Sequence, residues 1–273
     1  MRARVPFRLV GGAQPLIVLP TRFNGGEPID CVLDTGASHA MLLPALADRL
    51  GVAADEVKEA RGAGGAVRVA IGRARTLAVG AIEARDVPVL ISDELRRIST
   101  ALGAPLGGGI GYSFLSRYRL TVDYAELAIT LATPEETIDP APARTELAFT
   151  LAHPTKPLIL VPVMVEGTPF RFAIDTGAST TVVSPSVAQG PALEGAAASG
   201  MTGGGGTVAA APGMIPTQAI GGVRLARVRA MVAAFVDDIG AAAWAPIHGI
   251  IGGNVLRRFR VTIDYPRALL RLE

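Results

Sequence analysis

Two copies of one short motif constrain the fold more than any other feature of this 273-residue sequence. Residues 33–38 read LDTGAS and residues 174–179 read IDTGAS, so the motif aspartate recurs from position 34 to position 175, an offset of 141 residues. One register held at many positions indicates a real duplication, and the chain should fold as two copies of one unit. The further identical pairs at this offset are Pro28, Gly62, Gly80, Gly111, Leu115, Arg117, Thr121, Asp123 and Tyr124 with Pro169, Gly203, Gly221, Gly252, Leu256, Arg258, Thr262, Asp264 and Tyr265.

The segment between the copies reads as a linker. Residues 133–143 (TPEETIDPAPA) are rich in proline and acidic residues and have no apolar period. We therefore expect an N-terminal lobe at residues 1–132, a linker at 133–144 and a C-terminal lobe at 145–273. Asp123 and Asp264, which precede a tyrosine near the end of each copy, should form turns.

Composition favours a turn-rich β protein, because the chain has 32 Gly, 20 Pro and only 5% aromatic residues. A hairpin is expected around residues 24–28 and its counterpart around 166–169, because Gly, Pro and Asn mark turns between apolar runs. Brief helices are expected at 44–50, 113–118 and 254–259. Strands are expected at 16–19, 29–33, 67–71, 76–79, 87–91, 119–123, 158–165, 170–174 and 260–264.

Charge and apolar patterning exclude several classes of protein. The net charge is only +2 and no basic run is present, so we expect no nucleic-acid partner. No apolar run is long enough to span a membrane, and the N-terminus lacks the apolar core of a signal peptide. The sequence as written predicts a soluble, cytoplasmic protein, or a periplasmic or secreted one if an upstream signal has been removed. Cys31 is the single cysteine, so no intramolecular disulfide forms, and its position favours a core role.

The repeated motif predicts paired carboxylates. An Asp that ends an apolar strand before Thr-Gly lies on a tight turn, where backbone N–H groups can hold its oxygens. Two carboxylates about 3 Å apart cannot both ionise, so Asp34 and Asp175 would share one proton. The ionised member can take a proton from water while the protonated member polarises a carbonyl. This chemistry needs no cofactor and no metal, and His39, His153 and His248 are not spaced as metal ligands.

These motifs resemble the aspartic proteases of the clan that contains the pepsins and retropepsins. The resemblance rests on Asp-Thr-Gly-Ala in each copy and on downstream apolar-Gly elements at 109–111 and 250–252, and it covers nearly the whole of both lobes. It implies a mainly β fold of two similar β-barrel lobes related by a pseudo-twofold axis, with an active cleft between them. It also implies that Thr35 and Thr176 brace the two loops, beside Gly36 and Gly177. Ile110 and Ile251 would belong to the wall of the substrate site.

The resemblance further implies two substrate-covering flaps and a polypeptide substrate held extended beneath them. Ala follows the motif Gly, as in retropepsins, and neither flap hairpin contains the tyrosine that pepsins carry. The chain is therefore best described as a single-chain fusion of two retropepsin-like lobes. The flap tips would be Gly62, Ala63, Gly64 and Gly65 in one lobe and Gly203, Gly204, Gly205 and Gly206 in the other.

Several alternatives stay open at the level of sequence. A fused pair can be active as a monomer, but equivalent lobes of two chains could also pair in a homodimer. A non-catalytic peptide-binding or scaffold protein that retains the fold is the competing function. His248 either lines the cleft or lies on the surface, and Trp244 belongs either to the core or to a subsite wall.

Overall fold

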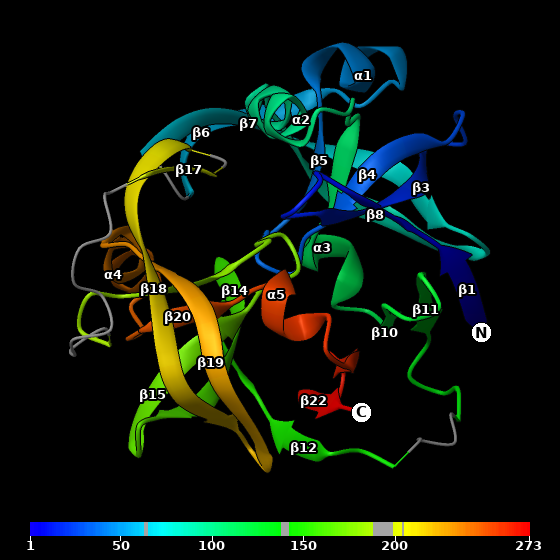
Figure 1. The fold of residues 1–273 in the computed structure, drawn as a ribbon. Helices are drawn as coiled ribbons and strands as arrows, with labels where there is room; N and C mark the ends of the chain where they lie inside the picture. Colours follow the sequence, from blue (N-terminus) through cyan, green and yellow to red (C-terminus); the bar gives the residue numbers. More distant parts are fainter. Residues whose placement is uncertain (63–64, 138–141, 188–198, 204) are drawn as a thin grey trace.

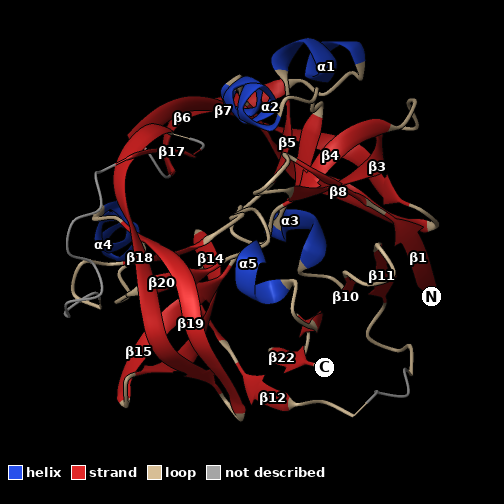
Figure 2. Cartoon of the chain, in the orientation of Figure 1, coloured by secondary structure: helices blue, strands red, loops and turns tan. Residues whose placement is uncertain are grey.

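The computed structural model describes residues 1–62, 65–137, 142–187, 199–203 and 205–273 (Figure 1). Strands dominate, and the helices are short (Figure 2). The mainly β fold predicted from composition and from the repeat is confirmed. The limits proposed for the two lobes stay a prediction, and residues 138–141 of the expected linker lie outside the described residues.

Each lobe contains an eight-stranded sheet, and the two sheets have the same order of equivalent strands. A further pairing within each sheet, β3 with β7 and β14 with β18, curls it towards a barrel. In the N-terminal lobe the order is β2 (Arg8–Val10), β3 (Leu16–Phe23), β4 (Ile29–Leu33), β9 (Gly108–Ile110), β5 (Ala40–Leu42), β8 (Ile82–Ile91), β7 (Gly65–Val79) and β6 (Ala54–Gly62). In the C-terminal lobe it is β13 (Thr150–His153), β14 (Lys156–Val165), β15 (Thr168–Ile174), β20 (Gly249–Ile251), β16 (Thr181–Val183), β19 (Val223–Val232), β18 (Gly206–Ile220) and β17 (Ser199–Gly203).

A six-stranded sheet joins the two lobes, and the sequence did not predict that sheet. Its order is β1 (Arg2–Pro6), β11 (Ala128–Ala132), β10 (Arg119–Asp123), β21 (Arg260–Asp264), β22 (Leu269–Leu272) and β12 (Thr145–Ala148). The central strands β10 and β21 are repeats of each other and run antiparallel, with Thr121 directly opposite Thr262. The two buried hydroxyls are 2.9 Å apart, so the pseudo-twofold axis passes between them.

The central threonine pair provides a test of the joint between the lobes. Replacing Thr262 by Val leaves the buried Thr121 hydroxyl without its partner, which we expect to lower the free energy of unfolding by about 1–3 kcal/mol. The double variant Thr121→Val/Thr262→Val removes both hydroxyls and should recover part of this loss. Urea unfolding of both variants beside the wild-type protein measures the effect. A single variant as stable as the wild type would show that this hydrogen bond does not matter.

Five helices are present in the described part of the chain: α1 (Pro44–Arg49), α2 (Glu94–Leu102), α3 (Tyr112–Leu115), α4 (Phe235–Ala242) and α5 (Gly253–Leu256). The predicted helices at 44–50, 113–118 and 254–259 correspond to α1, α3 and α5. The helices α2 and α4 were not predicted from the sequence. The apolar spacing of Leu95, Ile98 and Leu102 was the signal for α2.

One strand prediction was wrong in its extent. Residues 67–71 and 76–79 were expected as two strands, but they belong to the single long strand β7. Gly72 lies between the two apolar runs, and the strand continues through it. Only glycine fits at this point, because a side chain would collide with the Ala53 carbonyl of the neighbouring segment.

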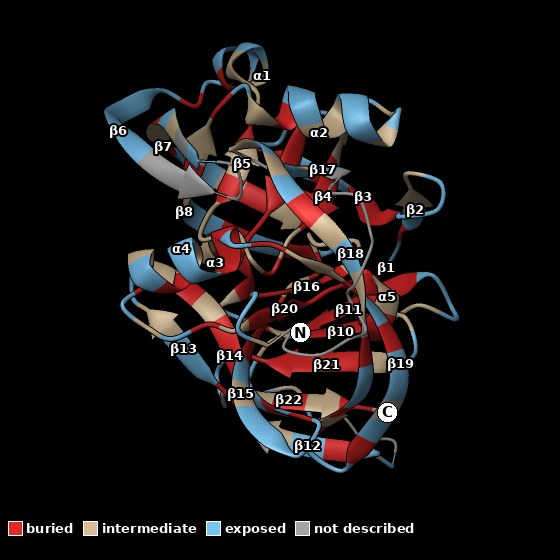
Figure 3. Ribbon diagram, turned by 60° about the vertical axis from the view of Figure 1, so that its left-hand side comes forward, coloured by how far each residue is buried: buried red, intermediate tan, exposed pale blue. Residues whose placement is uncertain are grey.

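The main hydrophobic core runs through both lobes and through the sheet that joins them (Figure 3). Two smaller apolar clusters lie beside it, one in each lobe. The N-terminal cluster includes Leu95 of α2 together with Val32 of β4. Its C-terminal counterpart includes Val236 of α4, Ala173 of β15 and Ile250 of β20. The helices α2 and α4 therefore cover equivalent apolar surfaces.

Candidate active site

Asp34 and Asp175 each stand at the first position after a central strand, β4 in one lobe and β15 in the other. The backbone N–H of Asp34 donates to the Ile110 carbonyl at 3.0 Å, and that of Asp175 donates to the Ile251 carbonyl at 3.1 Å. Strand β9, which runs parallel to β4, thus holds the start of the Asp34 loop. Strand β20, which runs parallel to β15, holds the start of the Asp175 loop.

The prediction that Ile110 and Ile251 belong to a substrate-contacting wall is not supported. Their side chains are 1% and 0% exposed and belong to the main core. A substrate resting on the molecular surface would not reach them. Their contribution to the site is the carbonyl that accepts the aspartate N–H.

Thr35 and Thr176 join the two loops through reciprocal hydrogen bonds. Each backbone N–H donates to the hydroxyl of the other threonine, at 3.1 Å from Thr35 and 3.0 Å from Thr176. The Thr35 hydroxyl donates to the Ile174 carbonyl at 3.1 Å, and the Thr176 hydroxyl donates to the Leu33 carbonyl at 2.8 Å. Both side chains are buried, so the four hydrogen bonds are shielded from water. These hydrogen bonds join the two loops across the lobes, and the supporting role of the threonines at the site stays a prediction.

The motif glycines bring the two carboxylates together. A Cβ atom on Gly36 would lie 2.5 Å from Oδ2 of Asp175, and one on Gly177 would lie 2.5 Å from Cγ of Asp34. Each carboxyl group therefore packs against the glycine of the other lobe, in space that any larger residue would occupy. The turn amides hold the oxygens as expected: Gly36 and Ala37 donate to Oδ1 of Asp34, both at 2.9 Å, and Gly177 donates to Oδ1 of Asp175 at 2.7 Å.

Both carboxyl groups have raised pKa values. Burial among protein atoms is the largest cause in each case, because it penalises the charged form. The negative charge of Asp175 raises the pKa of Asp34 further, and a hydrogen bond links the two side chains. Hydrogen bonds from the turn amides act in the opposite direction. The two carboxyl groups are therefore expected to titrate as a coupled pair.

The raised pKa of Asp34 makes stability depend on pH. A carboxyl group whose pKa is higher in the folded than in the unfolded chain stabilises the fold below its ordinary pKa of 3.8, and this contribution is lost as the pH rises through the folded pKa. We expect the wild-type free energy of unfolding to fall, relative to that of Asp34→Asn, between about pH 4 and pH 7. Urea titrations of both proteins at the two pH values measure the change. A difference independent of pH would contradict it.

Tyr124 and Tyr265, seen in the sequence only as repeat positions, lie near the carboxylates. Burial is the main cause that raises the pKa of each hydroxyl. The negative charge of Asp175 raises the pKa of Tyr124 further, and the charges of Asp34 and Asp175 both raise the pKa of Tyr265. The Tyr265 ring contacts the Tyr112 ring edge to face at 5.7 Å and so reaches across to the other lobe. No sequence signal beyond the repeat indicated this placement.

The two predicted flaps are hairpins that meet. β6 and β7 form one, β17 and β18 the other, and a Cβ atom on Gly65 would lie 4.0 Å from the Gly205 carbonyl oxygen. β6 also contacts α4, and β17 contacts α2, so each flap reaches the helix of the opposite lobe (Figure 1). The tip residues Gly62, Gly203 and Gly206 are described and pair within their hairpins. Ala63, Gly64 and Gly204 lie outside the described residues.

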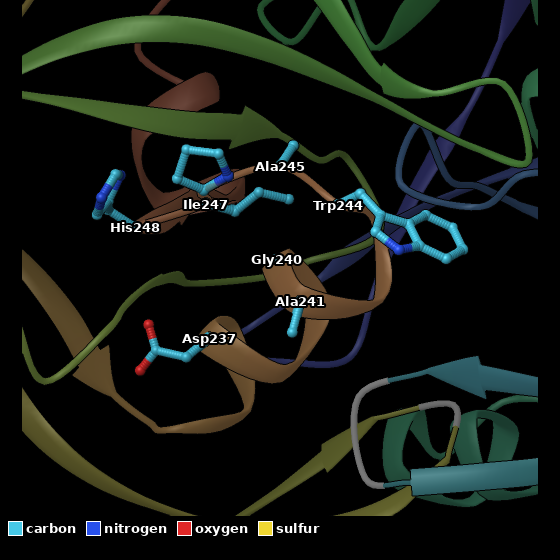
Figure 4. A pocket seen from close by; sticks show the side chains of 8 residues that line it. Asp237, Gly240, Ala241, Trp244, Ala245, Ile247 and His248 are labelled. Carbon is cyan, nitrogen blue, oxygen red and sulfur yellow. The ribbon is translucent and has the colours of Figure 1, made fainter.

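His248 and Trp244 line a shallow cavity of about 330 Å³ beside α4 (Figure 4). Trp244 is 76% exposed, so the core alternative is wrong for it, and its ring contacts the His153 ring at 4.7 Å. His248 accepts the Arg171 N–H on Nδ1 at 3.2 Å and lies against the Phe170 ring. These contacts hold His248 beside β15 and do not link it to the carboxylates.

Other sequence predictions concern structural residues. Cys31 is buried, and burial raises the pKa of its thiol to about 12, which suits a core residue rather than a nucleophile. Asp123 and Asp264 accept turn N–H groups, as expected. They also pair across the lobes, with Arg260 at 3.7 Å and with Arg119 at 3.9 Å respectively.

The described part of the chain contains no group of three or more His, Cys, Asp or Glu residues arranged to hold a metal ion. Among the same residues, no helix is both long and apolar enough to cross a membrane.

A family model described as aspartyl protease matches residues 19–114 and, separately, residues 161–255. The two matches fall in the two lobes, and each includes one of the paired aspartates. No curated protein matches the chain.

Proposed function

The chain belongs to the aspartyl protease family, and from this premise we propose that it is an endopeptidase in which Asp34 and Asp175 jointly activate water. The observation that carries the proposal is the placement of the two carboxyl groups: each packs against the motif glycine of the other lobe, and a hydrogen bond links the two side chains. The substrate would be an extended polypeptide, and no cofactor or metal takes part. One chain supplies both halves of the site, so a monomer would be active.

The proposed reaction has two steps. The ionised carboxylate takes a proton from water while the protonated carboxyl group donates a hydrogen bond to the scissile carbonyl. The water oxygen bonds to the carbonyl carbon, and a tetrahedral intermediate results with no covalent link to the protein. The C–N bond then breaks as the leaving nitrogen receives a proton from the dyad. The raised pKa values support this proposal, because a coupled pair that shares one proton supplies both a base and an acid.

Residues outside the dyad have supporting roles in this proposal. Thr35 and Thr176 hold the loops in register, and Gly36 and Gly177 leave room for the carboxylates. The flap hairpins cover the substrate and offer backbone groups to it. A reaction that depends on two carboxylates in one geometry needs such rigid support, because small displacements cost rate.

The proposal is tested by incubating the protein with a mixture of unstructured peptides and reading the products by mass spectrometry between about pH 3 and 7, the range over which a coupled dyad titrates. We expect cleavage at internal bonds that persists in a metal chelator. A peptide analogue with a hydroxyl group in place of the scissile carbonyl should block it. Folded protein that binds this analogue and cleaves nothing would instead support the non-catalytic peptide-binding protein.

A further inference from the structure

The internal repeat allows the two halves of the site to be compared position by position. At the offset of 141 residues, His39 corresponds to Thr180 and Lys58 corresponds to Ser199. We call Ser38, His39 and Lys58 the His39 half-site, and Ser179, Thr180 and Ser199 the Thr180 half-site. The catalytic loops are the same in both, so the two half-sites differ where a substrate would extend away from the dyad.

The His39 side chain is held beside the first catalytic loop. His39 follows Asp34 by five positions, and its carbonyl lies so close to Gly111 that no side chain fits there. The Ser38 hydroxyl lies 2.8 Å from Nδ1 of His39. The ring is partly exposed, and among the described residues Nε2 has no hydrogen-bond partner. With Nδ1 engaged by the serine, Nε2 is the atom that a ligand can reach.

Lys58 lies on the flap strand β6. Burial is the main cause that lowers the pKa of His39, and the positive charge of Lys58 lowers it further. Glu56, on the same strand, pairs with Lys58 at 3.3 Å, but both side chains are about half exposed. Such exposed pairs are worth little, so Lys58 remains free to move to another acid. Asp237 and Asp238 of α4, which contacts β6, are exposed to solvent.

The Thr180 half-site carries no charge at the matching positions. The Ser179 hydroxyl donates to the Gln14 side chain of the other lobe at 3.3 Å, whereas its repeat Ser38 pairs with His39. Thr180 is partly exposed and has neither the length nor the charge of a histidine. The duplicated site has therefore become different at its two ends.

We propose that the cleft binds its substrate in one direction, with an acidic side chain of the peptide on the His39 side of the scissile bond and an uncharged one on the Thr180 side. This inference rests on the proposed function. An extended peptide between flap and dyad would pass the loop that carries His39, and Nε2–H of His39 would donate to its carboxylate while the positive charge of Lys58 attracts it. A charge-assisted hydrogen bond is stronger than a neutral one, so Glu should be preferred over Gln.

The test uses one peptide sequence with Glu, Gln or Lys placed on either side of its cleaved bond, assayed at about pH 6, where Glu is ionised. When the varied residue is on one side of the cleaved bond, and not when it is on the other, we expect the wild-type kcat/KM for the Glu peptide to exceed that for the Lys peptide about tenfold. This ratio corresponds to about 1.4 kcal/mol. His39→Thr should reduce this preference. Thr180→His should create a similar preference on the other side, and it supplies an independent variant if His39→Thr folds poorly. Equal Glu and Lys rates on both sides in the wild type would overturn the inference.

A binding experiment separates this inference from the proposed function. Non-cleavable peptides with a reduced scissile bond, carrying Glu or Lys, are titrated into wild type, Lys58→Ser and His39→Thr. If the wild type binds the Glu peptide more tightly than the Lys peptide and the two variants do not, the half-site assignment is supported even if no peptide is cleaved. Equal binding of both peptides contradicts the assignment even if cleavage is efficient.

Discussion

Replacing Asp34 by Asn is expected to lower kcat/KM for peptide cleavage by about 10³-fold or more, and replacing Asp175 by Asn should have the same effect. General acid–base catalysis contributes about 10²–10⁴-fold to rates, and either change removes a carboxyl group on which both steps depend. An amide cannot accept the proton from water, and it cannot pass a proton to the leaving nitrogen. Initial rates on one good peptide, measured from about pH 3 to 7 where the dyad titrates, give the loss.

The double variant sharpens this prediction. Residues that act as one unit show non-additive losses, so Asp34→Asn/Asp175→Asn should be about as inactive as either single variant. Losses that multiply would mean that each aspartate acts independently. The reciprocal threonine hydrogen bonds do not involve the carboxylates, so folding should persist, and circular dichroism and urea unfolding check this. A single variant that retains wild-type activity would contradict the shared-dyad mechanism.

Replacing Gly177 by Ala is expected to lower kcat/KM by about 10²-fold, because a misplacement of about 1 Å at a catalytic group costs this much. The added methyl group would lie 2.5 Å from both Cγ and Oδ1 of Asp34, closer than non-bonded atoms approach. The carboxylate of the opposite lobe must therefore move. Gly36→Ala should act in the same way on Asp175. Steady-state kinetics at the wild-type pH optimum measure both losses.

Gly222→Ala is the matched control for this experiment. Gly222 lies in the turn between β18 and β19, and a Cβ atom there would meet the Arg144 carbonyl oxygen at 3.3 Å without touching the dyad. The activity of the Gly222→Ala variant should stay within about twofold of wild type, since surface substitutions of this kind usually have small effects. Full activity in Gly177→Ala would show that the carboxylates do not need this close packing.

The sequence alone determined the internal repeat and the local turns. The offset of 141 residues located both aspartates, and Gly, Pro and Asn located the turns of the hairpins at 24–28 and 166–169. Such signals are readable because turn residues and apolar alternation act over a few neighbours. The helix α2 was readable by the same rule and was missed, since its apolar positions recur at helical spacing.

The tertiary structure decided how the two copies meet, and no local pattern encodes that. Thr121 and Thr262 were known repeat positions, yet only docking of the lobes placed them opposite each other at the centre of the joining sheet. Docking also set Gly177 against Asp34, and the folding of the C-terminal sheet buried the side chain of Ile251 in the core. The physical reason is that these contacts lie between residues far apart in the chain, whose approach depends on the packing of whole sheets. The sequence therefore identified the two carboxylates, and the interface between the lobes made them a pair.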